Sequence, residues 1–194
     1  MKRNLHWQVL SFFVLLSGII FAQAGNYYDG INPASPSFIN DLKNRIRSPY
    51  TIIDYGQFDE TYVTNFASRD TLPSPKRVVT CVYSGENYIY TPPFAWNYFS
   101  REHTWCQSWM PYYNNSLETR PEYSDQHHLF PANQDKANGI RSNHPLGVVQ
   151  SATYTYLEAK MGSNTSNRVV WEPRNSHKGD AARALLYMSV RYDG

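Results

Sequence analysis

Four histidines stand among acidic and amide side chains in one stretch of the 194-residue chain: His103, His127, His128 and His144. Acid and amide oxygens suit a hard cation such as Mg²⁺ or Ca²⁺, and an imidazole beside them suits a general base. These groups could hydrolyse a phosphodiester, because a base takes a proton from water while a cation neutralises the charge that develops on the phosphate. A surface cluster without a catalytic role is the alternative, and composition alone leaves both open. The acids and amides of this stretch are Glu102, Asp125, Asn133, Asp135, Asn138 and Asn143.

Several other enzyme classes lack their motifs in this sequence. No HExxH or HxH spacing is present, which argues against a zinc peptidase, and no GxSxG is present, which argues against a serine hydrolase of that type. Neither a P-loop nor a GxGxxG occurs.

The first 24 residues are expected to be a secretory signal peptide. Lys2 and Arg3 form a charged start, residues 9–21 form an apolar run, and Ala22-Gln23-Ala24 forms a cleavage site. A membrane anchor is the alternative, but a serine and a glycine interrupt the run, which favours the signal peptide. The mature chain would then be one exported domain over residues 25–194, with no second apolar stretch of membrane length.

Net charge gives no easy argument for a nucleic-acid partner. The whole chain carries +2, from 18 Lys and Arg against 16 Asp and Glu. Removing Lys2 and Arg3 with the signal peptide leaves 16 of each, so the mature chain has no net charge. A nucleic-acid binder of this kind needs a local basic patch, a bound cation, or both.

Hydrophobic periodicity and turn residues predict a loop-rich α+β domain. The predicted elements are a helix that begins at Ser35-Pro36 and stops at Pro49, a short helix over 59–66, a β-hairpin over 77–90, an extended segment over 98–105, a helical segment over 133–142 and a helix over 177–192.

The two cysteines, Cys81 and Cys106, leave two interpretations open. Export would favour a disulfide between them. Alternatively, both are buried thiols that pack as small apolar residues. Their wide spacing argues against a zinc or redox motif.

Two ordered blocks carry the chemically unusual residues. The first is FSREHTW over 99–105, and the second is DQHHLFPA over 125–132 followed by NGIRSN over 138–143. Together they resemble the bacterial endonuclease I family, which are secreted or periplasmic nucleases of the His-Me finger (ββα-metal) class. The resemblance extends over essentially the whole mature chain, from the tyrosines at 27–28 to KGDAARA at 178–184.

The resemblance implies a role for three residues of these blocks. His103 matches the family's general base, which would deprotonate the attacking water. Glu102 and Asn138 match the family's metal ligands, for one divalent cation that would be Mg²⁺, with Ca²⁺ or Mn²⁺ as alternatives. The implied fold is a ββα-metal core surrounded by helices and long loops.

The adjacency of Glu102 and His103 raises a geometric question. Consecutive residues of a regular strand point to opposite faces. Both side chains can therefore serve one site only if the strand ends or bulges there, or if the metal sits to one side.

Two arginines of the blocks are candidates for contact with the phosphate, and each has an alternative role. Arg101 either touches phosphate or pairs with an acid such as Glu102. Arg141 either binds phosphate or ties down the loop through Asp135. The family also uses an arginine to hold the phosphate, and Arg120 is a further candidate for that role.

Three polar residues of the second block are expected to be structural. His127 and His128 are adjacent, so in extended chain they point in opposite directions, and a structural hydrogen bond is the expected role of both. Asn143 is expected to cap a helix end rather than to bind metal.

The sequence departs from the family pattern at two places. Ile140 stands where many members carry Asp, and we expect this to change local packing rather than activity. Members usually continue past the late helix with a further segment, so residues 25–194 are expected to be a C-terminally incomplete nuclease domain.

We therefore expect an exported, monomeric, metal-dependent endonuclease that cleaves DNA and RNA without sequence preference and that leaves the membrane once the signal is removed. Two alternatives remain: a binding domain without catalytic activity, and a secreted phosphodiesterase that acts on small substrates. Cleavage of a long duplex and of a simple phosphodiester would separate them.

Overall fold

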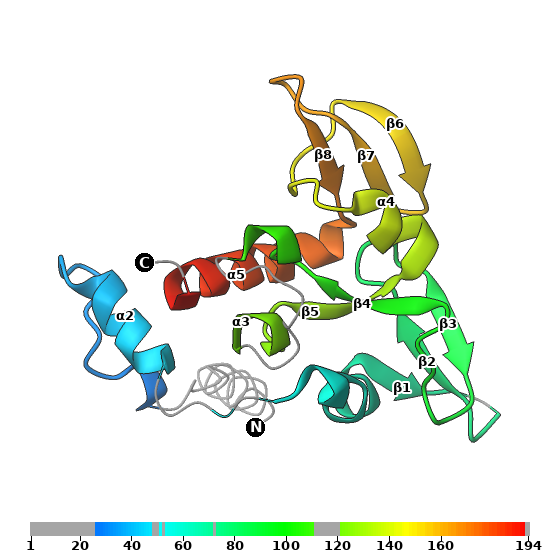
Figure 1. Cartoon of the computed structure of the whole chain (residues 1–194), viewed down its shortest axis with the longest axis horizontal. Helices are drawn as coiled ribbons and strands as arrows, with labels where there is room; N and C mark the ends of the chain where they lie inside the picture. Colours follow the sequence, from blue (N-terminus) through cyan, green and yellow to red (C-terminus); the bar gives the residue numbers. More distant parts are fainter. Residues whose placement is uncertain (1–25, 48–50, 52, 72, 111–120, 193–194) are drawn as a thin grey trace, which may run out of the picture. The chain divides into compact units, whose positions relative to one another are not determined.

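The computed structural model of the chain describes residues 26–47, 51, 53–71, 73–110 and 121–192. The expected signal peptide and Arg120 lie outside these residues. The chain divides into two compact units, Met1–Ser48 and Pro49–Gly194, which are described separately. Figure 1 shows the elements of each. Within the described part of the chain, no helix is both long and apolar enough to cross a membrane.

The first unit contains a short 3-10 helix, η1 (Asn26–Tyr28), and an α-helix, α2 (Phe38–Arg47). The predicted first helix is thus confirmed, although it begins at Phe38 rather than at Ser35-Pro36. The Ser35 hydroxyl instead accepts a hydrogen bond from the backbone N–H of Ser37 at 3.2 Å, so the serine shapes the turn before the helix.

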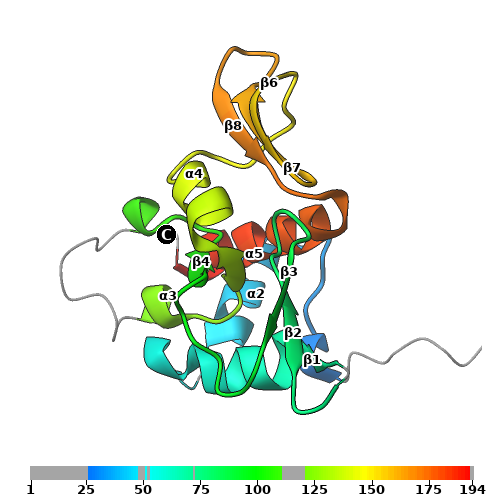
Figure 2. The same cartoon turned by 90° about the vertical axis from the view of Figure 1, so that its right-hand side faces the viewer.

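The second unit combines helices with three small antiparallel sheets, which confirms the predicted α+β class. One sheet has the order β1 (Ser68–Asp70), β2 (Arg77–Thr80), β3 (Asn87–Tyr90), and it contains the predicted hairpin. A second sheet pairs β4 (Phe99–His103) with β5 (Leu129–Asn133). The third has the order β6 (Ser151–Tyr156), β7 (Ala159–Ser163), β8 (Val169–Glu172), and it stands apart from β1–β3 in both views (Figures 1 and 2).

The helices of the second unit are mostly short. They are η2 (Tyr55–Gln57), η3 (Asp59–Ala67), η4 (Gln107–Trp109), α3 (Pro121–Ser124), η5 (Gln134–Asn138), α4 (Gly139–Arg141) and α5 (Asn175–Tyr192). Of these, η3 and η5 are π-helices and α5 is an α-helix. They confirm the helices predicted over 59–66, 133–142 and 177–192, respectively. In α5 the buried stripe includes Ala181, Ala184 and Met188, as the apolar spacing predicts.

The core of the second unit is rich in aromatic side chains. Trp171 of β8, Phe99 of β4 and Tyr83 are fully buried, and the Tyr83 and Trp171 rings meet edge to face with centroids 5.8 Å apart. A backbone hydrogen bond of 3.1 Å from Val82 to Pro131 joins the segment after β2 to β5. The β4–β5 pair is therefore fixed from one side by a packed core.

Both cysteines are buried, and neither forms a disulfide. The interpretation as buried thiols is therefore confirmed. Cys81 accepts a hydrogen bond at Sγ from the backbone N–H of Asn133 at 3.3 Å. Cys106 lies near the Ser142 carbonyl, 3.9 Å from Sγ to the oxygen.

Candidate active site

The two antiparallel strands β4 and β5 set the position of the candidate site. Glu102 pairs with Phe130 and His103 with Leu129, and β4 ends at His103. Asn133 ends β5 and caps the helical segment that follows, because its Oδ1 accepts hydrogen bonds from the backbone N–H groups of Asp135 (3.1 Å) and Lys136 (2.8 Å). The Asn133 amide in turn donates to Glu86 Oε2 at 2.7 Å. The start of η5 is therefore anchored to the turn between β2 and β3.

The helical segment η5 then returns to β4. Asn138, its last residue, donates from Nδ2 to the Ser100 hydroxyl at 2.6 Å, across 38 residues of sequence. This bond leaves Oδ1 as the amide atom that can serve as a ligand. The two strands and the helix after them thus bring Asn138 beside the residues of β4.

A pocket of about 210 Å³ lies at this junction. It brings together four of the five residues singled out from the sequence: Arg101, Glu102, His103 and Asn138. The fifth, Arg141, is not among the lining residues. The remaining lining residues are Tyr55, Cys106, Gln107, Tyr123, Ser142 and Asn143.

The end of β4 answers the geometric question about Glu102 and His103. The strand stops at His103, and the next hydrogen bond of this segment runs from the Thr104 N–H to the His128 carbonyl at 2.9 Å. Both side chains line the one pocket, and both are nearly buried, Glu102 being 3 % and His103 9 % exposed. The first of the alternatives, a strand that ends there, is the one found.

The Glu102 carboxylate is held at one oxygen. Oε1 accepts a hydrogen bond from the Tyr83 hydroxyl at 2.9 Å and a charge-assisted bond from the Arg141 guanidinium. Within the described part of the chain, every hydrogen bond of this carboxylate ends on Oε1, which leaves Oε2 for a cation. Burial raises the pKa of Glu102, while Arg141 and Tyr83 act in the opposite direction.

Arg141 is fully buried and does not line the pocket. Besides Glu102, its guanidinium donates to the carbonyl oxygens of His103 and Thr104, each at 2.8 Å. Its acidic partner is Glu102. Asp135, the partner that the sequence analysis offered as one alternative, is not the partner found. This geometry favours a structural role in fixing the end of β4 over contact with phosphate.

Arg101 lies in the pocket with its guanidinium between two aromatic rings. Its Cζ is 4.8 Å from the Tyr55 ring centroid and 4.6 Å from that of Trp96. Among the described residues, Arg141 and not Arg101 is the basic partner of Glu102. Contact with two rings fixes the plane of the guanidinium.

The His103 ring has a defined proton. Its Nε2 lies 2.8 Å from the Tyr123 carbonyl oxygen, which can only accept, so Nε2 carries the hydrogen and Nδ1 is left as the acceptor. The ring stacks on Tyr55 with centroids 5.6 Å apart and planes 4° from parallel. Burial, with a smaller contribution from the charge of His128, lowers the pKa of His103 to about 3. The ring is therefore neutral at pH 7 and can accept a proton.

The other polar residues of the second block make structural contacts. The His128 Nε2 donates to the Glu122 carbonyl at 2.9 Å, and the His127 Nδ1 bonds Asp125 Oδ1 at 2.8 Å, as expected for structural histidines. Asn143 was expected to cap a helix end. Ser142, with φ 49°, is instead the cap residue after α4, and Asn143 lines the pocket.

The donor set fits a hard cation with few protein ligands. Within the described residues, no group of three or more His, Cys, Asp or Glu side chains could hold a metal ion. Glu102 Oε2 and Asn138 Oδ1 supply one carboxylate and one amide oxygen. Mg²⁺ commonly binds through one or two protein oxygens and keeps several waters, so this set suits it better than zinc.

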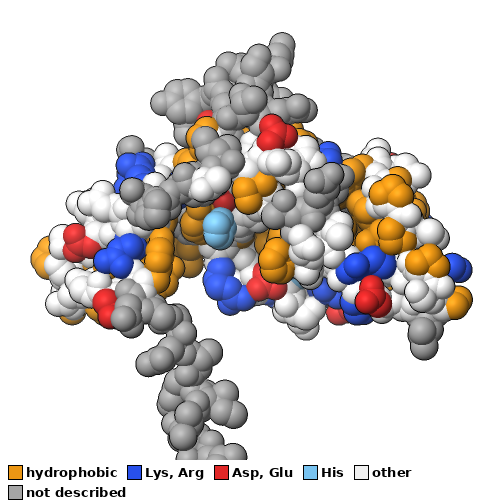
Figure 3. Space-filling view, turned by 90° about the horizontal axis from the view of Figure 1, so that it is seen from below, with side chains coloured by type: hydrophobic (Ala, Val, Ile, Leu, Met, Phe, Trp, Pro, Cys, Tyr) orange, Lys and Arg blue, Asp and Glu red, His pale blue; other side chains and the backbone are white. Residues whose placement is uncertain are grey.

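The face of the molecule seen in Figure 3 is of mixed charge. On the face shown in Figure 3, described basic and acidic side chains lie beside one another instead of forming one broad basic patch. This agrees with the balance of charges in residues 25–194. Any affinity for a polyanion must then come from local groups such as Arg101 and a bound cation.

Comparison with known proteins shows which family the chain resembles over most of its length. The family model described as Endonuclease I matches residues 37–194. The extracellular ribonuclease of Bacillus subtilis (strain 168) is 30 % identical over 180 residues, which cover 90 % of this chain and 56 % of that protein. The extracellular ribonuclease of Bacillus amyloliquefaciens is 29 % identical over 177 residues, or 89 % and 55 %. The chain thus spans about half the length of these curated relatives, and no solved structure gives a significant match.

Replacing Arg141 by Met should destabilise the fold strongly. The Glu102 carboxylate would be left buried without its cationic partner, which typically costs about 3–5 kcal/mol. The matched control is Arg183→Met, because Arg183 pairs with Asp180 at the surface and such pairs contribute about 0–1 kcal/mol. Urea denaturation of both variants measures the difference, and equal losses of stability would contradict a special role for Arg141.

Acid should destabilise the fold before its carboxylates titrate. Burial is the main cause that lowers the pKa of His103 to about 3 and the pKa values of His128 and His177 to about 4, from 6.5. Between pH 6.5 and 4 the unfolded chain therefore binds more protons than the folded one, so the free energy of unfolding falls as the pH falls. Glu102, whose pKa is raised, opposes this, but it is one group against three. Denaturation curves at pH 7, 5.5 and 4.5 give the slope, and a flat or rising free energy toward acid would refute it.

Proposed function

The chain belongs to the endonuclease I family, and we propose that it is an exported nuclease that hydrolyses internal phosphodiester bonds of DNA and RNA without reading base sequence. The observation that carries the proposal is the pocket in which a neutral His103 stands beside the carboxylate of Glu102 and the amide of Asn138. A base and a pair of oxygen ligands in one pocket are the groups that phosphodiester hydrolysis needs.

We further propose that β4, β5 and the helical segment η5–α4 form the His-Me finger of this family. His103 stands at the end of the first strand, Asn138 projects from the helical segment, and Glu102 precedes the histidine. This supports the ligand set Glu102 and Asn138, with Arg141 as the group that holds Glu102 in place.

In the proposed reaction, the Nδ1 atom of His103 accepts the proton of the attacking water. The bond from Nε2 to the Tyr123 carbonyl keeps Nδ1 unprotonated, and the same carbonyl stabilises the imidazolium that forms. An anionic phosphate bound in the pocket would raise the pKa of His103 from its value in the free protein, which strengthens it as a base. When bound, a divalent cation, Mg²⁺ or alternatively Ca²⁺ or Mn²⁺, would neutralise the phosphate charge and assist departure of the 3′-oxygen.

Arg101 is proposed to orient the phosphate. Its guanidinium is stacked between Tyr55 and Trp96, so few rotamers remain to be lost when substrate binds. Two N–H groups of one guanidinium can bind two phosphate oxygens at once. Contact with the phosphate rather than with base edges is consistent with cleavage that ignores sequence.

Both RNA and DNA are proposed as substrates. The two curated relatives are named ribonucleases, which supports RNA. A mechanism that activates water does not need the ribose 2′-hydroxyl as nucleophile, so DNA is a substrate of the same pocket. The relatives are also named extracellular, which supports export by the predicted signal peptide at residues 1–24.

Replacing His103 by Ala should lower the rate of cleavage by about 10²–10⁴-fold, the usual contribution of a positioned base. Binding to DNA should stay intact, because the ring contacts water and not the phosphate in this proposal. The control is His144→Ala, a histidine of the same stretch that does not line the pocket. Plasmid nicking and a binding titration measure the two effects, and a His103→Ala variant with normal turnover would remove His103 as the base.

Chelation should stop cleavage of both substrates. EDTA should abolish nicking of a plasmid and cleavage of an RNA, and excess Mg²⁺ should restore both, since Glu102 and Asn138 alone cannot neutralise the phosphate. Retained RNA cleavage in EDTA with loss of DNA cleavage would point instead to a metal-free mechanism through the 2′-hydroxyl. Hydrolysis of bis(p-nitrophenyl) phosphate but not of plasmid would favour the small-molecule phosphodiesterase.

A further inference from the structure

Two histidine rings donate to adjacent carbonyls at the end of α3. His103 Nε2 donates to the Tyr123 oxygen at 2.8 Å, and His128 Nε2 donates to the Glu122 oxygen at 2.9 Å. The two rings lie side by side, with centroids 5.2 Å apart. The direction of the α3 carbonyls therefore decides which nitrogen of His103 holds the proton.

Asp125 directly follows α3 and is fully buried at its carboxylate. Its Oδ1 accepts hydrogen bonds from the His127 backbone N–H at 3.0 Å and from the His127 ring at 2.8 Å. These bonds close the turn between α3 and β5. The turn includes the backbone that carries His128, whose N–H reaches the Asp125 carbonyl at 3.4 Å.

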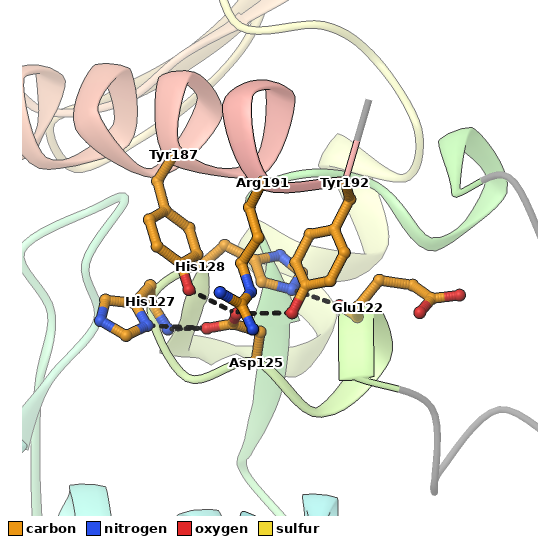
Figure 4. Close-up of polar contacts among 7 residues, drawn as sticks. All are labelled: Glu122, Asp125, His127, His128, Tyr187, Arg191 and Tyr192. Carbon is orange, nitrogen blue, oxygen red and sulfur yellow. Dashed lines mark hydrogen bonds and ion pairs between the residues drawn. The ribbon is translucent and has the colours of Figure 1, made fainter. Parts of the chain in front are cut away.

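The second carboxylate oxygen ties this turn to the end of α5. Oδ2 accepts hydrogen bonds from the hydroxyls of Tyr187 and Tyr192, each at 2.8 Å, and Arg191 Nε lies 3.6 Å away (Figure 4). These partners come from 62 to 67 residues farther along the chain. One buried carboxylate thus joins the turn after α3 to the last turns of α5.

The charge of Asp125 is well supported in this position. Burial alone would raise its pKa, but the hydrogen bonds from the His127 ring and backbone outweigh burial and hold the pKa below its usual range. Asp125 therefore stays an acceptor at both oxygens throughout the working pH range of a nuclease.

We propose that Asp125 is a positioning residue for His103: by clamping the α3–β5 turn to Tyr187, Arg191 and Tyr192, it keeps the Tyr123 carbonyl on His103 Nε2 and so leaves Nδ1 as the base. The proposal rests on the proposed role of His103 and adds a group that touches neither substrate nor cation. A carboxylate that only stabilised the fold would leave the tautomer of His103 unchanged when weakened.

Asp125→Asn tests the clamp with little change in shape. One of the two oxygens becomes an amide nitrogen, which donates where the hydroxyls and the arginine also donate. We expect kcat for plasmid nicking to fall by up to about 10²-fold, with KM changed by no more than about twofold, because a misplaced group costs rate and not binding. Long-range ¹⁵N–¹H correlation spectra of histidine-labelled protein should show His103 as Nε2–H in the parent chain and as a tautomer mixture in the variant.

A double variant, Tyr187→Phe with Tyr192→Phe, tests the same clamp and keeps Asp125 charged. The rings remain, including the stacking of Tyr187 on His127 at 4.3 Å, while two hydrogen bonds to Oδ2 are lost. The matched control is Tyr98→Phe, which removes a tyrosine–carboxylate hydrogen bond to Glu86 outside the clamp and should leave the His103 tautomer unchanged. If Asp125→Asn does not fold, the double variant decides the question.

Two outcomes separate this proposal from the proposed function. Folded clamp variants with His103 still entirely Nε2–H and with kcat within about twofold of the parent would overturn the role of Asp125 alone. A His103→Ala variant with full activity, used also to assign the His103 signal, would overturn the base itself and leave any tautomer change without catalytic meaning.

Discussion

The Arg141 guanidinium joins α4 to the end of β4 at the candidate site. It donates to the Glu102 carboxylate and to the carbonyls of His103 and Thr104, so one buried side chain from α4 holds the end of β4 in place. Without that anchor, the carbonyls of His103 and Thr104 would lose these donors in a buried environment, where an unpaired polar group costs about 1–3 kcal/mol. The placement of Glu102 toward the pocket and the closure of the helical segment onto the strand both depend on it.

Aromatic rings around the pocket fix the orientation of its polar side chains. Tyr55 stacks on His103 and on the Arg101 guanidinium, and Tyr123 covers the His103 ring at 4.6 Å. Flat rings that stack on imidazole and guanidinium groups fix the planes of those groups. Two residues of unlike chemistry are thereby held by one tyrosine.

Much of the fold could be predicted from the sequence because the predicted elements have local signatures. Each of these signals comes from residues that are close together in the sequence. Examples are the apolar stripe of α5, the turn between β2 and β3 and the helical composition after Asn133. The sheet β6–β8 was not among the predicted elements. No residue of β6 is buried, so this strand lacks the buried apolar residues that mark a core strand. Ile140, where a family pattern has Asp, packs against the core.

The candidate site was predictable only in part, for a similar reason. Glu102, His103 and Asn138 carry distinctive side chains in ordered blocks, and the structure brings all three to one pocket. The acceptor that sets the His103 proton is the backbone carbonyl of Tyr123, and no side-chain pattern marks a carbonyl. The pairing of Arg141 with Glu102 spans 39 residues, which spacing within a helix cannot anticipate.

The commitment of one Glu102 oxygen to Tyr83 and Arg141 has a consequence for the lifetime of any bound cation. Such a carboxylate can reach a cation through one oxygen only, and the Asn138 amide is a neutral partner. Water would fill most of the coordination sphere, so the ion would exchange readily with the medium instead of staying resident. The cation would then behave as a co-substrate. Activity would depend on the concentration of divalent ions around the protein and would be low where that concentration is low.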